Sequence, residues 1–593
     1  LEPVHIAWEG ALPPLRGRLP HVAVRCRLEL ETGTVHEWSG ALHERANGNE
    51  KADWRTGLPR TVPFGYHRLE LCAGSAAFET SIISAPRRAY DLPEASAWGL
   101  FLPLYAFRSA RGDGADYAAL GALARWTHER GGSLFGTLPL LATFLAEPFE
   151  PSPYAPASRL FWNDFYIDVD RLPGAHPDPR LDAGRRELAQ CADADVVDYR
   201  RIAALKRRII DDAAQRFFGG PCDSRREPDA ITRDYARFRA VCDRRRQGWH
   251  DWPDRLRSGD IRDGDFGPRD EQYHLYAAWV AERQLAEIAG RPPRRAAALY
   301  LDLPLGVHRD GFDSWRWPRL FASGASAGAP PDTFFPGGQD WGFAPVEPRA
   351  LRADGYRYFR DCLRHHARFA GALRLDHVMS LERLFWIPRG FAPDQGVYVR
   401  YPLDEMMAVL TLESVRHRTA IVGEDLGTVS RSLRTAMGRH GLYRMFVLQF
   451  EATPGDESPP RGIPRFAVAS LNTHDMPPFA AWRRGGRDDV DPAQGEASAG
   501  AHARVAAERG VTETKTALGR ALDGLAASRA RCVILNLEDL WLETRPQNMP
   551  GSPSEQNWRH RARLTFDEIR GDPDIGRQLE RIADKRQPDP SES

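Results

Sequence analysis

The sequence lacks the features that mark a secreted, disulfide-linked or membrane-spanning protein. Its seven cysteines are scattered and include no C-x-x-C pair, which argues against both a disulfide framework and a zinc site. No apolar run approaches the roughly 18 residues that a membrane span needs. The N-terminal stretch LEPVHIAWEG has no basic region followed by an apolar one, so it does not resemble a signal peptide. We therefore expect a cytoplasmic protein without a membrane partner.

An excess of charge of one sign is also missing. The 593 residues include 81 Lys plus Arg and 81 Asp plus Glu, so the formal net charge is zero. Nothing in this balance favours a nucleic acid as partner. The chain has no G-x-G-x-x-G or P-loop motif and no cluster of metal-ligand residues, so we expect neither a cofactor nor a metal.

The first 85 residues alternate apolar and polar side chains. HVAVRCRLELETG and YHRLELCAG have the two-residue period of half-buried antiparallel strands, and Gly or Pro marks the turns between such stretches. A linker rich in Pro, Ala and charged residues follows at about residues 84–95. We therefore predict a small β-sandwich domain over residues 1–85.

Eight short apolar runs follow, several of them separated by segments with helical spacing. Apolar strands that alternate with helices are typical of a parallel sheet buried on both faces, and eight such units predict a (β/α)8 barrel. The runs are AWGLFLPLYAF (97–107), GSLFGTLPLL (132–141), AAALYLDLPL (296–305), FAGALRLDH (369–377), RTAIVGEDL (418–426), YRMFVLQFE (443–451), RFAVASLNTHD (465–475) and RCVILNLEDL (531–540). We predict an α/β protein whose catalytic barrel occupies residues 86–593.

Two long segments interrupt the predicted barrel. About residues 142–295 separate the second run from the third, far more than a loop of a few residues requires. This segment has helical stretches such as DYRRIAALKRRIIDDAAQRFF, which predict an inserted helical subdomain. About residues 306–355 are rich in Gly, Pro and aromatics, and we expect them to form little regular structure and to line a cleft at the barrel top.

Acidic residues stand at the ends of several predicted strands, where barrel enzymes place their reacting groups. Like charges in one pocket raise the pKa of at least one group, so that one carboxyl group stays ionised while another holds a proton. A carboxylate nucleophile with a carboxylic acid partner suits retaining glycoside chemistry. The acidic residues are, in chain order, Asp302, Asp376, Glu424, Asp425, Asp475, Glu538 and Asp539.

Each of these residues alone has a simpler interpretation. A single Asp at a strand end is more often a helix N-cap or a loop anchor than a catalyst. An R-x-D pair such as Arg374 and Asp376 is usually a structural ion pair. However, LRLDH, VGEDLG and LNTHD each close an apolar run of their own, and their joint occurrence in this order favours catalysis.

These motifs resemble the 4-α-glucanotransferases, glycoside hydrolase family 77 of the α-amylase clan, in its longer bacterial maltodextrin-metabolising type. The resemblance covers about residues 95–561, and the β-rich N-terminal segment is similar to the extra domain of the longer members. It is carried by SPYAPASRLFWNDFYID (152–168), GAPPDTFFPGGQDWG (328–342), RLDHVMSLERLFWIP (374–388), DQGVYVRYPLDE (394–405), VGEDLGTV (422–429) and LEDLWLETRPQNMPGSPSEQNWRHR (537–561). It implies transfer of an α-1,4-glucan segment to the 4-hydroxyl of glucose or a maltodextrin.

The resemblance also implies roles for individual residues. Asp376 would be the nucleophile, Glu424 the general acid and base, and Asp475 the stabiliser of the transition state. By strand alternation Arg374 would share a face with Asp376 and keep it ionised, whereas His377 would face away, with packing and binding both open to it. The implied substrate-binding residues are Arg374, His474, Asn472, Trp341, Gln339, Tyr154, Ser152, Asn163 and Asp302, with Trp341 and Tyr154 as platforms for pyranose rings.

Two departures and two alternatives remain. RLDHVMSLERLF replaces the commoner RIDHFRG, and DLPLGVHRDGFDSW differs from the commoner DLPIYV form, which leaves acceptor preference open. The three carboxylates alone also suit an amylase-type α-glucan hydrolase, and the β-sandwich suits a non-catalytic glucan-binding protein. The family-specific loops favour transfer over hydrolysis, and the intact carboxylate trio argues against a non-catalytic protein.

Overall fold

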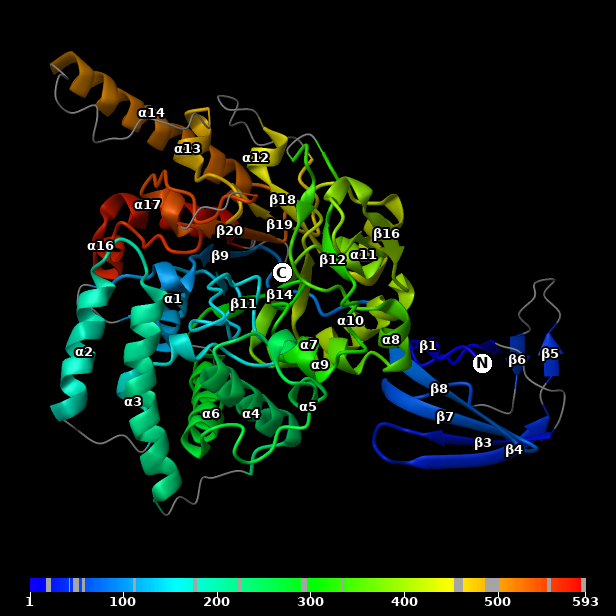
Figure 1. Cartoon of the computed structure of the whole chain (residues 1–593). Helices are drawn as coiled ribbons and strands as arrows, with labels where there is room; N and C mark the ends of the chain where they lie inside the picture. Colours follow the sequence, from blue (N-terminus) through cyan, green and yellow to red (C-terminus); the bar gives the residue numbers. More distant parts are fainter. Residues whose placement is uncertain are drawn as a thin grey trace. The chain divides into compact units, whose positions relative to one another are not determined.

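The chain forms two compact units in its computed structural model, whose elements Figure 1 labels. Unit 1 comprises Leu1–Asp91, Trp317–Arg368 and Leu375–Tyr443, and unit 2 comprises Leu92–Arg316, Phe369–Arg374 and Arg444–Ser593. The structure describes residues 1–16, 23–41, 43–45, 53–55, 59–109, 114–173, 179–220, 227–289, 296–332, 335–452, 462–485, 501–551 and 556–587.

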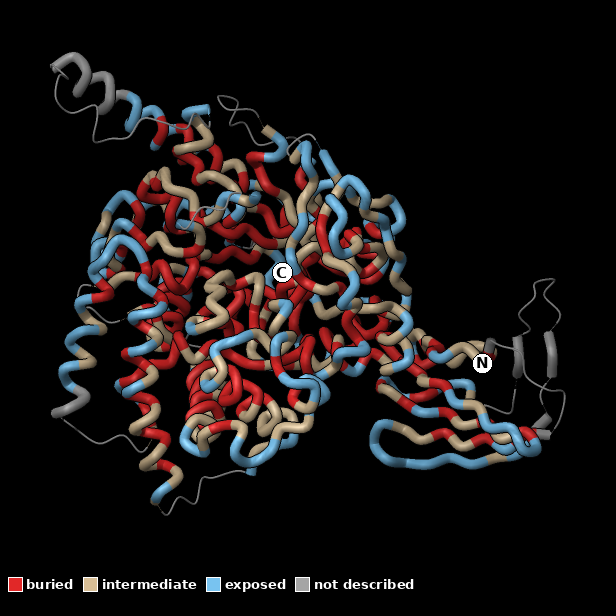
Figure 2. Tube along the Cα trace, in the orientation of Figure 1, coloured by how far each residue is buried: buried red, intermediate tan, exposed pale blue. Residues whose placement is uncertain are grey.

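The N-terminal part of unit 1 is built from two sheets. One has the strand order β1 (Val4–Trp8), β8 (Ala76–Ala85), β7 (Gly65–Ala73), β3 (Ala23–Glu29), β4 (Val35–Ala41), and the other has the order β2 (Leu15–Arg16), β6 (Asp53–Arg55), β5 (His43–Arg45). Buried and less buried residues alternate along β7, as the two-residue period predicts (Figure 2). The pairing is antiparallel as expected except at β1, which runs parallel to β8.

Eight strands close into the predicted barrel, and each lies in one of the eight apolar runs. The barrel order follows the chain: β9 (Ala97–Phe101), β10 (Leu134–Gly136), β11 (Ala298–Leu303), β14 (Ala370–Leu375), β17 (Ala420–Gly423), β18 (Tyr443–Val447), β19 (Ala467–Ser470) and β20 (Cys532–Asn536). The first four of the five residues of β20 are buried, as strands covered on both faces require. The (β/α)8 prediction is therefore confirmed.

Helices occupy the connections between these strands. Local caps explain several helix starts: the side chains of Asp116 and Ser430 accept hydrogen bonds from backbone N–H groups in the first turns of α1 and α11. Outside the two long insertions the helices are α1 (Tyr117–Glu129), α9 (Arg357–Ala367), α10 (Leu403–His417), α11 (Arg431–His440), α12 (Leu448–Glu451), α13 (Phe479–Arg483), α14 (Ala501–Ala526), α15 (Leu537–Leu540), α16 (Phe566–Gly571) and α17 (Pro573–Arg586).

The predicted insertion between the second and third strands is helical. It contains α2 (Pro179–Ala192), α3 (Tyr199–Gly219), α4 (Ala230–Arg245), α5 (Asp254–Arg257) and α6 (Pro268–Ala289), with α6 packed on α3 and α4 (Figure 1). Aromatic rings fill its core. Phe161 stacks on Tyr235 with ring centroids 3.8 Å apart, and Phe238 packs on Trp252.

The segment after the third strand is more regular than predicted. It contains α7 (Phe312–Arg316), β12 (Ala325–Ala329), β13 (Gln339–Asp340) and α8 (Pro348–Ala353). Strands β13 and β12 join β15 (Arg383–Pro388) and β16 (Val397–Arg400) in a four-stranded sheet. Composition gave no sign of this sheet because the strand that pairs with β12 lies more than 50 residues further along the chain.

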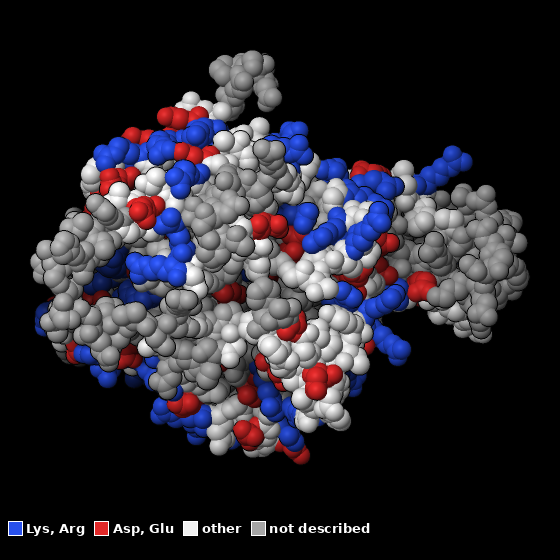
Figure 3. Space-filling view, turned by 90° about the horizontal axis from the view of Figure 1, so that it is seen from above, with Lys and Arg blue, Asp and Glu red and all other residues white. Residues whose placement is uncertain are grey.

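No helix in the described part of the chain is long and apolar enough to cross a membrane. Basic and acidic side chains are interspersed on the face shown in Figure 3, in keeping with the zero net charge.

Candidate active site

A buried ion pair joins the strand ends of β11 and β14 in unit 2. Nη1 of Arg374 lies 2.6 Å from Oδ2 of Asp302, and their side chains are 8% and 5% exposed. The hydroxyl of Tyr154 donates to the same carboxylate oxygen at 2.6 Å. The other oxygen, Oδ1, is buried without a hydrogen-bond partner, so Asp302 keeps an acceptor for an incoming hydroxyl group.

The sequence pointed to both charged residues but not to their pairing. Arg374 was expected to support Asp376, two residues along the chain; that role stays a prediction. Its ion-pair partner is Asp302, 72 residues away. Both line a small cavity of about 60 Å³ together with Asn472 and His474. Four of the predicted substrate-binding residues therefore meet at one place.

Asp475 lies beyond the end of β19 and is held by two side chains. Nε2 of His474 lies 3.3 Å from Oδ2, and Nδ2 of Asn548 donates to Oδ1 at 2.6 Å. The side chain of Asp475 is 42% exposed. Partial removal from water raises its pKa, but His474 and Asn548 outweigh this and lower the pKa to about 2. Asp475 is therefore an accessible carboxylate that is ionised at neutral pH.

An aromatic cluster supports His474. The rings of Tyr154 and His474 stack with centroids 4.9 Å apart, and Trp558 packs against both, at 5.6 Å and 5.8 Å. Burial lowers the pKa of His474, but the adjacent Asp475 raises it more, so the net shift is upward. Tyr154, a predicted sugar platform, thus has one face taken by protein. Trp558 was not singled out, although its N-W motif was the available signal.

Unit 1 holds the other two predicted catalytic carboxylates. Asp376 is the first residue after β14, and Glu424 is the first residue after β17. The backbone N–H of His377 donates to Oε2 of Glu424 at 2.8 Å. The N–H of Glu424 in turn donates to the carbonyl of Leu375 at 3.1 Å. Both carboxylates are partly exposed, and these backbone bonds hold their chain segments together.

The strand-alternation argument does not apply to His377. β14 ends at Leu375, and His377 has φ 46°, so strand alternation does not extend to it. Its ring lies edge-on to Trp341 with centroids 5.0 Å apart. Burial lowers the pKa of His377 to about 4, despite the opposing effect of Asp376, so the ring is neutral. Nε1 of Trp341 donates to Oε1 of Gln339 at 3.1 Å, which brings two more predicted residues to this place.

Ser152 and Asn163 make contacts within their own loops. The Ser152 hydroxyl accepts a hydrogen bond from the N–H of Tyr154 at 3.3 Å. Asn163 is 5% exposed, accepts from the N–H of Phe165 at 3.0 Å and donates to the hydroxyl of Thr143 at 3.2 Å. Asn at such a cap satisfies a free N–H, so these contacts give Asn163 a structural role, and its predicted contact with a sugar hydroxyl stays a prediction.

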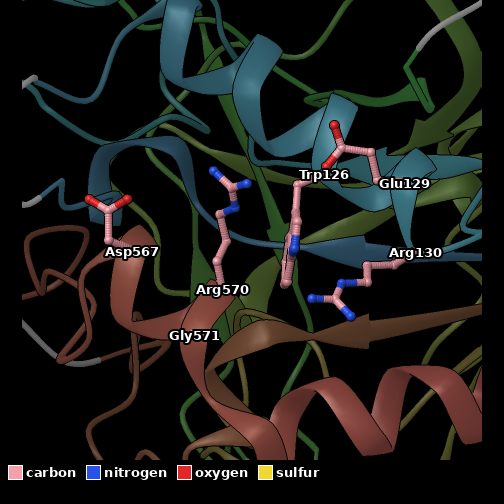
Figure 4. Close-up of a pocket in the computed structure, with 6 residues that line it drawn as sticks. All are labelled: Trp126, Glu129, Arg130, Asp567, Arg570 and Gly571. Atoms are coloured by element: carbon pink, nitrogen blue, oxygen red, sulfur yellow. The ribbon is translucent and has the colours of Figure 1, made fainter.

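A separate cavity of about 500 Å³ contains none of the predicted residues. It lies between the end of α1 and α16, and Figure 4 shows the indole of Trp126 standing between the side chains of Arg130 and Arg570. In the described residues, no group of three or more His, Cys, Asp or Glu side chains is placed to hold a metal ion.

Two family models match the chain. One, described as 4-alpha-glucanotransferase, matches residues 102–565. The other, described as the MalQ N-terminal beta sandwich domain, matches residues 1–86.

Similar proteins carry consistent names. A 4-alpha-glucanotransferase of Mycobacterium tuberculosis is 32% identical over 555 residues, covering 85% of this chain and 76% of the relative. One of Haemophilus influenzae is 31% identical over 461 residues, covering 70% and 65%. The crystal structure of amylomaltase from Corynebacterium glutamicum has the same fold, with a TM-score of 0.81 at 24% identity, over 99% of this chain and 90% of that one.

Proposed function

Because this chain belongs to glycoside hydrolase family 77, the 4-α-glucanotransferases, we propose that it moves a segment of an α-1,4-glucan to the 4-hydroxyl of glucose or a maltodextrin. The observation that carries the proposal is the pairing at two strand ends of unit 1. Asp376 and Glu424 each follow a barrel strand directly, and the hydrogen bond from His377 to Glu424 links their segments. Retaining glycoside chemistry needs such a pair of carboxyl groups.

In the first half-reaction, a carboxylate oxygen of Asp376 attacks the anomeric carbon of the donor. The bond from that carbon to the glycosidic oxygen breaks, and Glu424 gives its proton to the departing sugar oxygen. A β-glycosyl ester on Asp376 results. The backbone N–H of His377, 2.8 Å from Oε2 of Glu424, orients the acid for this transfer.

In the second half-reaction, the 4-hydroxyl of an acceptor sugar replaces the departed one. Glu424, now ionised, takes the hydroxyl proton while that oxygen attacks the anomeric carbon, and the ester bond to Asp376 breaks. Two inversions restore the α configuration. Water in the acceptor's place would give hydrolysis, so acceptor binding decides between the two reactions.

The unit 2 group would bind the sugar ring as positive charge develops at its anomeric carbon. Asp475 is ionised, and two neighbours hold its carboxylate, which suits it to accept hydrogen bonds from the 2- and 3-hydroxyls. The free oxygen Oδ1 of Asp302 supplies a further acceptor, while Arg374 and Tyr154 fix its other oxygen.

The remaining predicted residues would serve binding. Trp341 offers a partly exposed ring, and Gln339 orients it through the indole N–H. We propose residues 1–85 as the β-sandwich domain and 86–593 as the catalytic domain, with maltodextrins and glucose as substrates. We further propose a cytoplasmic location, since the six described cysteines are all free thiols.

Maltotriose as sole substrate tests this function. Transfer produces glucose together with maltopentaose and longer products, while the number of reducing ends stays constant. Products that only become shorter, with reducing ends rising in step, would contradict transfer and favour a hydrolase. Chromatography of the oligosaccharides with a parallel reducing-end assay separates the two outcomes.

A further inference from the structure

Two adjacent buried carboxyl groups lie just past the end of β20. Glu538 and Asp539 belong to α15 and are 2% and 1% exposed. No Lys, Arg or His side chain in the described residues forms an ion pair with either group. A buried carboxyl group without a cationic partner is costly, so its hydrogen bonds indicate what it is for.

Asp539 binds both ends of the segment that carries His474 and Asp475. Nδ2 of Asn472 lies 3.1 Å and 2.9 Å from its two oxygens. The backbone N–H of Phe479 donates to Oδ1 at 2.7 Å. Because Asn472 and Phe479 flank Asp475 on either side, a single carboxylate fixes the loop at both of its ends.

Glu538 holds a second loop in the same manner. Nε2 of Gln547 donates to Oε1 of Glu538 at 2.6 Å, and the hydroxyl of Tyr105 donates to Oε1 of Gln547 at 2.8 Å. The carbonyl of Gln547 accepts from the N–H of Trp558 at 2.8 Å. Glu538 therefore fixes the residue that immediately precedes Asn548, and through Gln547 it also fixes Trp558.

The two loops meet at the Asp475 carboxylate. Asn548 donates to Asp475 at 2.6 Å, and Trp558 packs on His474. We propose that Glu538 and Asp539 are positioning residues, which set the location of Asp475 for glucan transfer by fixing the loop that bears it and the loop that clamps it. This inference rests on the proposed role of Asp475.

The two carboxyl groups hold different protonation states. Burial raises the pKa of Glu538 to about 8 and that of Asp539 to about 6. At neutral pH Glu538 is therefore mainly a neutral acid. Glu538→Gln keeps this side chain uncharged and keeps the acceptor oxygen that Gln547 needs. Asp539 is mainly ionised, and Asp539→Asn places an N–H group against the donor Asn472. The two isosteric changes should consequently differ in effect.

The test measures kcat and KM for transfer from maltotriosyl fluoride to glucose. We expect Asp539→Asn to lower kcat by about 100-fold, because displacing a catalytic group by about 1 Å lowers the rate by about that factor. KM should change by less than about threefold. Glu538→Gln should change kcat by less than about threefold. Asp243→Asn is the matched control. This half-buried carboxylate of the helical insertion contacts Arg207 and His274, and its loss should leave kcat per folded molecule unchanged.

A double-variant cycle shows whether Asp539 acts through Asp475. In an Asp475→Asn background, Asp539→Asn should lower kcat no further, because the group it positions is already gone. A full additional loss, or an unchanged kcat in the single variant, would overturn the inference. If Asp539→Asn does not fold, Gln547→Met tests the Glu538 arm, with a drop in kcat at constant KM expected and an unchanged kcat contradicting it. A wild-type enzyme without transfer would instead refute the proposed function.

Discussion

Buried acidic residues in two regions of the molecule have different partners and opposite pKa shifts. In unit 1, Glu413 of α10 is 1% exposed, and Arg364 donates to both of its oxygens at 2.9 Å and 3.0 Å. Burial would raise its pKa, but hydrogen bonds from His417 and Arg364 lower it, so Glu413 is a charged group. In unit 2, Glu538 and Asp539 are contacted by amides and backbone N–H groups, and burial raises the pKa values of both.

The difference in partners distinguishes a structural anchor in unit 1 from the proposed binding site in unit 2. The Glu413 network extends to the N-terminal sheet, because Arg364 and Arg416 both bind Glu31, which follows β3. The guanidinium of Arg364 also lies 5.5 Å from the ring centroid of Tyr66 in β7. Charge paired with charge fastens the sheet to α9 and α10. Charge paired with amides and an imidazole, as at Asp475, leaves lone pairs for a substrate. Substitutions should therefore affect stability in the first region and turnover in the second.

Asp376→Asn should produce the largest effect on turnover. The amide cannot form the ester, so kcat should fall by roughly 10⁴-fold or more, while the free energy of unfolding changes little. Steady-state transfer from maltotriose, combined with urea unfolding, measures both quantities. Turnover within tenfold of wild type would mean that the nucleophile lies elsewhere.

Arg374→Met should lower both the free energy of unfolding and kcat, unlike the substitutions that affect only one of them. It leaves Asp302 as a buried charge without its cation, which costs about 3–5 kcal/mol of unfolding free energy. Adding Asp302→Asn removes that charge and should restore most of the stability but none of the turnover. If the double variant were as unstable as the single one, the ion pair would not be the cause.

Glu413→Gln should affect stability alone. Losing the charge leaves Arg364 without its buried partner, and we expect a loss of about 3 kcal/mol of unfolding free energy with kcat per folded molecule unchanged. Glu31→Gln, at a more exposed position, should cost under about 1 kcal/mol and less at high salt. A lower kcat per folded molecule in Glu413→Gln would contradict a purely structural role for Glu413.

Glu538 should make the free energy of unfolding depend on pH. Its folded pKa, about 8, lies above the unfolded value near 4.5, so the unfolded state loses its proton first as pH rises. Stability should therefore fall between about pH 4.5 and pH 8 by a few kcal/mol at most, and Glu538→Gln should flatten that part of the profile. Urea unfolding of both proteins at pH 5, 6.5 and 8 measures the slopes, and equal slopes would contradict a neutral buried Glu538.

The barrel was predictable from sequence because burial on both faces leaves an uninterrupted apolar run at each strand. The strand ends also pointed to Asp376, Glu424 and Asp475, because barrel enzymes carry their reacting groups there, and their catalytic roles stay predictions. Side-chain partners were not predictable. Asn548 and Asp475 lie 73 residues apart, and no local period encodes their hydrogen bond. The alternation argument failed at His377 because β14 ends two residues before it.

The covalent intermediate tests the central claim most directly. Glu424→Gln slows the second half-reaction, so a maltosyl fluoride donor should accumulate as an ester on the enzyme. Trypsin then releases the peptide Leu375–Arg383, which contains Asp376, and mass spectrometry locates the added sugar. The account predicts one maltosyl group on Asp376. A sugar on any other residue, or burst kinetics without any labelled peptide, would contradict it.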